Sequence, residues 1–155
     1  MGKKYSRYEY AKTVTFTRTT ANNAYKAQRD FLDFWAGQTS KAQFTSKLAS
    51  FATTVIEGIF NRTVYTALPG LVVTALADAN AVEQDAVEYV GKKGLRELTD
   101  LNSIFVDNKN YSAITFRVNY LAFKNLATGK TDYTIIQGNI VPTKIITTGG
   151  GTIPM

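Results

Sequence analysis

Residues 31–68 read FLDFWAGQTSKAQFTSKLASFATTVIEGIFNRTVYTAL and form the most strongly patterned part of the chain. Gly37 is typical of the position just past a helix, because glycine takes a left-handed backbone conformation at little cost. Ser40 and Gln43 match a capping box, in which each side chain bonds to the other residue's backbone amide. The stretch therefore predicts one helix that ends before Gly37 and a second that begins near Lys41.

The second helix carries an apolar stripe at helical spacing. Its members are Phe44, Leu48, Phe51, Val55 and Ile59. This spacing predicts a buried face on a helix that continues to Pro69–Gly70, a span of roughly 40 Å at about 1.5 Å per residue. Ile56, Phe60 and Val64 widen the stripe to a second face, which a chain of 155 residues can hardly enclose. We therefore expect these three residues, together with Trp35, to contact neighbouring subunits.

The residues before this stretch predict a strand and a helix. Residues 13–19, TVTFTRT, alternate polar side chains with Val14 and Phe16, which indicates a strand with one apolar face. The following residues have helical spacing, and Thr20 or Asn22 is the expected N-cap.

The residues after this stretch predict shorter helices and then strands. Residues 71–76, LVVTAL, fit a buried strand or a loop. A helix over 79–90 is expected to end at Gly91, and a short helix then follows to Leu101. Strands are expected over 103–106, 111–123, 131–141 and 143–148, with Pro142 restricting its segment to a sheet edge or a strand end. The order of elements predicts an α+β fold, with an N-terminal strand, a long central helix, shorter helices and C-terminal antiparallel strands.

Composition indicates a single globular domain. The chain is 45% hydrophobic, and its 21 threonines and 19 aromatic residues favour strands, because such side chains fit a pleated surface. No apolar run approaches 18 residues, and the N-terminus lacks the apolar region of a secretory signal. We therefore expect no membrane partner.

Two residue types are missing from the chain. It has no cysteine, which removes disulfides, thiolate nucleophiles and zinc–sulfur sites. It has no histidine, the side chain that most readily exchanges protons at neutral pH and the commonest metal ligand. We therefore expect no enzyme activity, no catalytic residue, no cofactor, no metal and no small-molecule substrate.

Positive charge is concentrated at the N-terminus. Residues 1–30 hold seven basic and two acidic residues, a net +5 of the chain's +6. This asymmetry divides the chain into a basic N-terminal arm over 1–12, a single domain over 13–148 and a Gly-rich tail over 149–155. The arm is expected to be solvated, or to contact nucleic acid or an acidic neighbouring subunit. The candidate contact residues are Lys3, Lys4, Arg7, Lys12 and Arg18.

Three local patterns could carry chemistry, but each has a simpler interpretation. Residues 91–94, GKKG, lack the spacing of a phosphate-binding loop and fit a helix end followed by a turn. The acidic residues within 83–88 are close enough to bind a divalent ion but fit the solvated face of a helix. Trp35, with Phe31 and Phe34, could stack on nucleic-acid bases, although their spacing favours core or interface packing.

The segment 28–101 resembles the major capsid proteins of tailed bacteriophages with the HK97-type fold. The shared features are an aromatic F-x-x-F-x-x-G step, a polar N-cap, a long spine helix and a closing segment before a proline. Here the matching residues are Phe31, Phe34, Gly37, Ser40, Phe44, Val64, Tyr65, Ala67, Leu68 and Pro69, followed by Gly91, Leu95 and Leu98. The chain is shorter than those proteins, and nothing in it resembles their extended loop. The resemblance implies a subunit whose long helix packs on its neighbours.

These observations together predict a self-assembling structural protein of a viral or phage particle, most simply a capsid subunit present in many copies. Its location would be the virion, assembled in the host cytoplasm, or the cytoplasm if the protein is not viral. A tail-tube or connector subunit is the first alternative, in which the strands build a ring. A nucleic-acid-binding accessory protein that uses the basic arm is the second.

Overall fold

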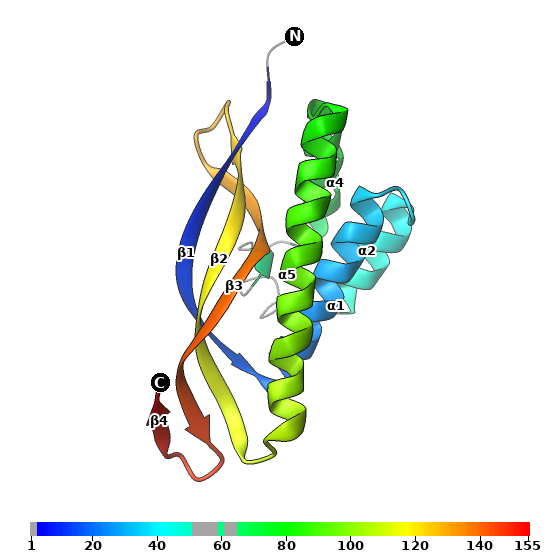
Figure 1. Cartoon of the computed structure of the whole chain (residues 1–155). Coiled ribbons are helices and arrows are strands. Elements are labelled where there is room, and N and C mark those ends of the chain that lie inside the picture. The colour runs from blue at the N-terminus through cyan, green and yellow to red at the C-terminus, as the bar shows by residue number, and fades with distance from the viewer. Residues whose placement is uncertain (1–2, 51–58, 61–64) are drawn as a thin grey trace.

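The computed structural model describes residues 3–50, 59–60 and 65–155. Four strands form one antiparallel sheet in the order β1-β2-β3-β4 (Figure 1). They are β1 (Tyr5–Thr17), β2 (Tyr111–Asn125), β3 (Thr131–Thr147) and β4 (Thr152–Pro154). The helices lie between β1 and β2 in the chain, so the predicted α+β order is confirmed.

The helices are α1 (Arg18–Trp35), α2 (Lys41–Ala49), α4 (Leu68–Asp78) and α5 (Ala81–Asp107), with a 3-10 turn η2 (Tyr65–Ala67) before α4. Capping boxes start three of them, at Thr17, Ser40 and Asn80. The box of Ser40 and Gln43 is the predicted one, whereas α1 begins at Thr17 rather than at Thr20 or Asn22. Gly37 follows α1 with φ of 78°, which confirms the predicted helix end.

The predicted long helix is not continuous, because α2 ends at Ala49 with Ser50 as its C-cap. Pro69 was expected to end a helix but lies in the first turn of α4. Backbone amides in the first turn have no acceptor within the helix, so proline loses no hydrogen bond there. Residues 71–76 are therefore helical and not a strand. Four residues of the predicted stripe and its second face lie outside the described residues: Phe51, Val55, Ile56 and Val64.

The longest described helix is α5, with 27 residues, and it contradicts three predictions. It passes through Gly91 without ending, it includes the short helix expected after Gly91, and it covers 103–106, which were expected to form a strand. Its buried positions Leu98, Leu101 and Phe105 recur three and four residues apart, which is the spacing of one helix face. The helical spacing therefore extends through residues 103–106, which were predicted to form a strand.

The N-terminal division of the chain also needs correction. Residues 5–12 belong to β1, which pairs with β2 without a register shift from Tyr5↔Asn125 to Thr17↔Ala113. The expected arm over 1–12 is therefore part of the sheet from Tyr5 onward. At the other end, the expected tail contains β4, and β3 runs through Pro142 with several register shifts against β2.

The core forms where α1 and α5 meet β3. In Figure 1, α5 runs alongside β3, and α1 packs against α5. A Cβ built on Gly94 would lie 1.9 Å from the backbone oxygen of Ile136, so the glycine lets the helix backbone approach the strand directly. The buried amide of Gln28 bonds to both backbone groups of Ile136, at 2.6 Å and 2.9 Å.

Aromatic side chains fill the centre of this core. Phe31 stacks on Trp35 with ring centroids 5.7 Å apart, and Phe123 stacks on Tyr133 at 4.3 Å. Phe60 is fully buried, with its ring 6.3 Å from that of Phe31. Phe60 was predicted to face another subunit, and the structure corrects this, because the residue lies in the chain's own core. No helix among the described residues is both long enough and apolar enough to cross a membrane.

Candidate assembly surface

The outer edge of β1 has no neighbouring strand among the described residues. In an antiparallel sheet, alternate residues direct both backbone groups to the same side. The amide of Leu126 donates to the carbonyl oxygen of Lys4, on the β1 side of β2. The amide of Asn125 donates instead to the carbonyl oxygen of Lys130, on the side away from β1. The even-numbered residues of β1 therefore bond to β2, and the odd-numbered residues direct their amides and carbonyls outward.

Side chains occupy both ends of this outward edge. The amide of Tyr5 donates to Asp78 Oδ2 at 3.2 Å, and the amide of Thr17 donates to Thr20 Oγ1 at 2.8 Å. The outward residues between these ends are Arg7, Glu9, Ala11, Thr13 and Thr15. The sheet order leaves their outer side without a neighbouring strand in the described part of the chain.

Features that commonly protect an edge strand are few here. Residues 5–17 contain no glycine and no proline, and the pairing of β1 with β2 has no bulge. Glu9, Ala11, Thr13 and Thr15 are exposed, and Arg7 is half-buried. An edge that is long, regular and exposed is a template for pairing with another strand. Only the charged side chains of Arg7, Glu9 and Lys12 interrupt it.

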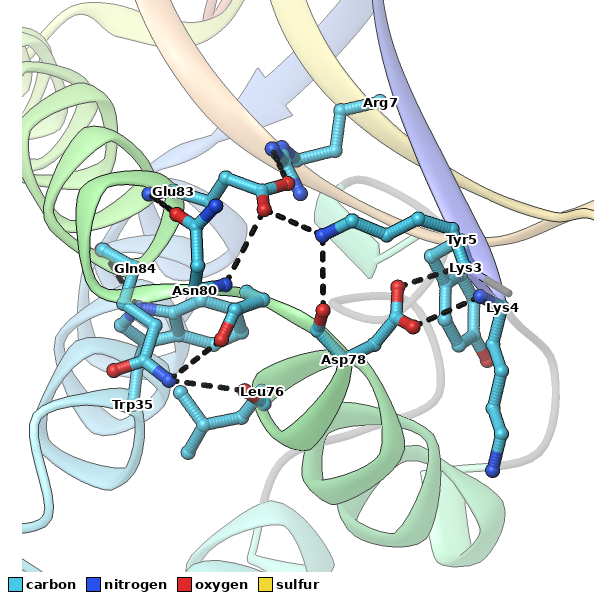
Figure 2. Close-up of polar contacts among 11 residues, drawn as sticks. Lys3, Lys4, Tyr5, Arg7, Trp35, Leu76, Asp78, Asn80, Glu83 and Gln84 are labelled. Carbon is cyan, nitrogen blue, oxygen red and sulfur yellow. Dashed lines mark hydrogen bonds and ion pairs between the residues drawn. The ribbon is translucent and has the colours of Figure 1, made fainter. Parts of the chain in front are cut away.

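The start of β1 is held by a group of ion pairs at the junction of α4 and α5, shown in Figure 2. Lys3 Nζ donates to Glu83 and to the carbonyl oxygen of Asp78, the latter at 2.9 Å. Arg7 Nη2 donates to Glu83 Oε2 at 2.7 Å. The Asp78 carboxylate accepts from the backbone amides of Lys4 and Tyr5. These contacts fix β1 on the body of the protein and explain why the basic segment is not a free arm.

Glu83 is the acceptor on which this junction depends. Hydrogen bonds from Lys3 and then Arg7, with that from the Asn80 amide, lower the pKa of its carboxyl to about 2. The ionised form is thus favoured in the folded protein. It contributes stability above the ordinary pKa of 4.5, and this stability is lost as the pH falls toward 2.

We expect Glu83→Gln to lower the melting temperature at pH 7, because Lys3 and Arg7 lose their charged acceptor. The difference from the wild type should shrink as the pH falls from about 5 to about 2, where the wild-type carboxyl itself becomes protonated. Thermal unfolding followed by circular dichroism across this range measures it. Asp85→Asn, on an exposed residue of the same helix, is the control. A difference that stays constant with pH would contradict the role given to Glu83.

The predicted cation set is divided by the structure. The side chains of Lys3 and Arg7 are bound to Glu83, and Arg18 donates to the carbonyl oxygen of Phe105 while its guanidinium lies 5.6 Å from that ring. Lys4 and Lys12 are exposed. The set therefore does not form one continuous basic patch.

The predicted interface and stacking residues lie inside the protein. Trp35 is 4% exposed and its indole donates to the carbonyl oxygen of Gln84 at 3.0 Å. Phe31 and Phe34 are buried beside it. The expectation that Trp35 contacts another subunit is corrected, as is that for Phe60, whereas Ile56 and Val64 lie outside the described residues.

The acidic residues of α5 are not gathered into a site. Glu83 is held by Lys3 and Arg7, and Glu88 pairs with Lys92 at 3.2 Å. Within residues 3–50, 59–60 and 65–155, no group of three or more acidic side chains could hold a metal ion. The glycines of the GKKG segment contact α1 and β3, so they serve helix packing.

Comparison with protein-family models, with curated proteins and with solved structures returned no match to this chain. The resemblance to tailed-phage capsid proteins therefore stays a prediction.

The edge of β1 was not predicted from the sequence. A signal for it was present in residues 5–12, YSRYEYAK, where Tyr8 and Tyr10 alternate with polar residues. The dense positive charge favoured a solvated arm instead.

Proposed function

We propose that the protein is a self-assembling structural subunit of a viral particle, located in the virion. One observation carries the proposal: the outward edge of β1 presents five residues with backbone groups directed to solvent. Pairing with a strand of another molecule would satisfy these groups in the way that strand addition joins many proteins.

The shape of the assembly follows from which element makes the contact. The capsid interpretation relies on a long spine helix over 41–68, and α2 ends at Ala49. The free sheet edge instead favours the tail-tube or connector alternative, in which strands join one subunit to the next. Both interpretations share the same function, a subunit that builds a particle from many copies.

The nucleic-acid-binding alternative has less support. Binding to nucleic acid needs several cations free to contact phosphates. Lys3, Arg7 and Arg18 are already engaged with groups of the chain itself. This alternative therefore becomes an outcome of the test.

The test is light scattering after size-exclusion chromatography of the purified chain, with negative-stain microscopy of the same fractions. Shells, rings or tubes are the expected result. A monomer at all concentrations would overturn the proposal. Salt-sensitive binding of DNA by such a monomer would support the accessory-protein alternative instead.

A further inference from the structure

The free part of the β1 edge is symmetric about Ala11. Its two ends, the amides of Tyr5 and Thr17, are bonded to Asp78 and Thr20, and each end lies six residues from Ala11. A two-fold axis at Ala11 would therefore superpose the free stretch of one copy on that of another, with the occupied ends facing each other.

The other sheet edges of the chain are poorer partners. The open side of β3 is occupied at Ile136, where Gln28 bonds to both backbone groups and Gly94 of α5 lies against the strand. The edge strand β4 has three residues and ends in Pro154, which has no amide to donate. Among the described residues, only β1 of a second copy offers an edge of the same length.

We propose that two copies of the chain pair their β1 strands antiparallel about a two-fold axis at Ala11 and so join their sheets. The proposal deepens the self-assembly proposed above and rests on it, with the closed pair as the building block of the particle. In this register Ala11 pairs with itself, Glu9 with Thr13 and Arg7 with Thr15. All five outward residues then exchange amide and carbonyl bonds.

Charge disfavours most of the neighbouring registers. A two-fold axis normal to the sheet pairs residues of the same parity, so the register changes in steps of two. An axis at Glu9, two steps from Ala11, would place Glu9 opposite Glu9. An axis at Lys12 would place two lysines opposite each other, and an axis at Arg7 would do the same with two arginines. Like charges directly opposite are unfavourable.

The axis at Ala11 avoids these repulsions and pairs complementary side chains. On the other face of the joined sheet, Tyr10 lies opposite Lys12, and Tyr8 lies opposite Val14. Strand pairs are stabilised when an ammonium group lies beside an aromatic ring, and also when an aromatic ring lies beside a β-branched residue. Tyr10 is already stacked on Tyr120 with ring centroids 5.5 Å apart, which limits its freedom before pairing.

An axis at Tyr10 would also avoid like charges, but it serves fewer outward groups. It pairs Arg7 with Thr13 and Glu9 with Ala11, and it leaves Thr15 opposite Tyr5, whose amide already bonds to Asp78. The axis at Ala11 is the one that uses every outward residue.

Engineered cysteines test the register directly, because the chain has no cysteine of its own. In the proposed pair the two Cα atoms of residue 11 lie about 5.5 Å apart, within the range of a disulfide. We expect Ala11→Cys to form a covalent dimer under mild oxidation. Glu9→Cys should not, because its two copies lie more than about 13 Å apart along the strands. A mixture of Glu9→Cys with Thr13→Cys should form a mixed disulfide.

Proline substitutions test the edge without cross-linking. Ala11→Pro removes an outward amide, so it should keep the native circular dichroism spectrum and weaken the association of the chains at least tenfold. Lys12→Pro is the matched control, since its amide bonds to β2, and it should lower the melting temperature instead.

The outcomes separate this inference from the proposed function. A covalent Ala11→Cys dimer of a chain that forms no larger particle supports the pairing and overturns the particle proposal. Particles that persist while Ala11→Cys stays reduced, or while Ala11→Pro assembles normally, overturn the pairing and leave the particle proposal standing. Cross-linking of Glu9→Cys as fast as of Ala11→Cys would show random collision and also overturn the pairing.

Discussion

Replacing Gly94 by alanine is expected to destabilise the protein by about 3 kcal/mol, the upper end of the usual cost of overpacking. The new Cβ would lie 1.9 Å from the backbone oxygen of Ile136 and 2.8 Å from Gln28 Nε2. A backbone atom cannot rotate away, so α5 must move off β3. For a chain of this length the melting temperature should fall by roughly 6–12 °C.

Two other glycines of the described helices provide a graded comparison. A Cβ on Gly91 would meet Leu32 Cδ2 at 2.5 Å, the end of a flexible side chain, so Gly91→Ala should cost less than Gly94→Ala. A Cβ on Gly70 would have no atom within 4 Å, and Gly70→Ala in α4 should be neutral or stabilise by about 0.4–1 kcal/mol. Equal melting temperatures for all three variants would contradict the close packing of α5 on β3.

The roles of these glycines could not be predicted from the sequence pattern. A glycine within a helical pattern can end the helix or admit a close neighbour, and both need the same residue. The backbone oxygen that decides between them belongs to Ile136, on a strand far along the chain. Only the tertiary structure places it beside Gly94.

Local signals were more reliable. The capping box of Ser40 and Gln43 and the left-handed Gly37 depend on neighbours within a few residues, and both were predicted. The strand over 111–123 was also predicted, because its alternation lies within one element. Pro69 was misassigned because a proline fits both the end of one helix and the start of the next.

The candidate surface could not be predicted from charge. The basic residues Lys3 and Arg7 indicated an arm in solution, but their partner Glu83 lies in α5, far away in sequence. Once Glu83 and Asp78 hold this segment, its backbone is extended beside β2 and its outer side is left free. The edge of β1 is thus a result of tertiary contacts at its two ends.

Replacing Gln28 by leucine is expected to cost about 2–5 kcal/mol, because it removes three hydrogen bonds to buried backbone groups. Gln28 Nε2 donates to the carbonyl oxygens of Ile136 at 2.6 Å and Gly91 at 3.1 Å, and Gln28 Oε1 accepts from the amide of Ile136 at 2.9 Å. The side chain is fully buried, so water cannot replace it. Leucine has a similar size, so the loss of stability measures the missing hydrogen bonds rather than an empty cavity.

Gln84→Leu is the matched control, because Gln84 Nε2 also donates to two backbone carbonyls, those of Leu76 and Ala79, each at 3.1 Å. Gln84 is half-buried, so water can reach these carbonyls and the loss should be smaller. Chemical denaturation gives the two free energies of unfolding, and hydrogen exchange at the amide of Ile136 should accelerate in Gln28→Leu alone. Slow exchange at Ile136 in that variant would mean that another group protects the open side of β3, and Gln28 would then not be what closes this edge to a second chain.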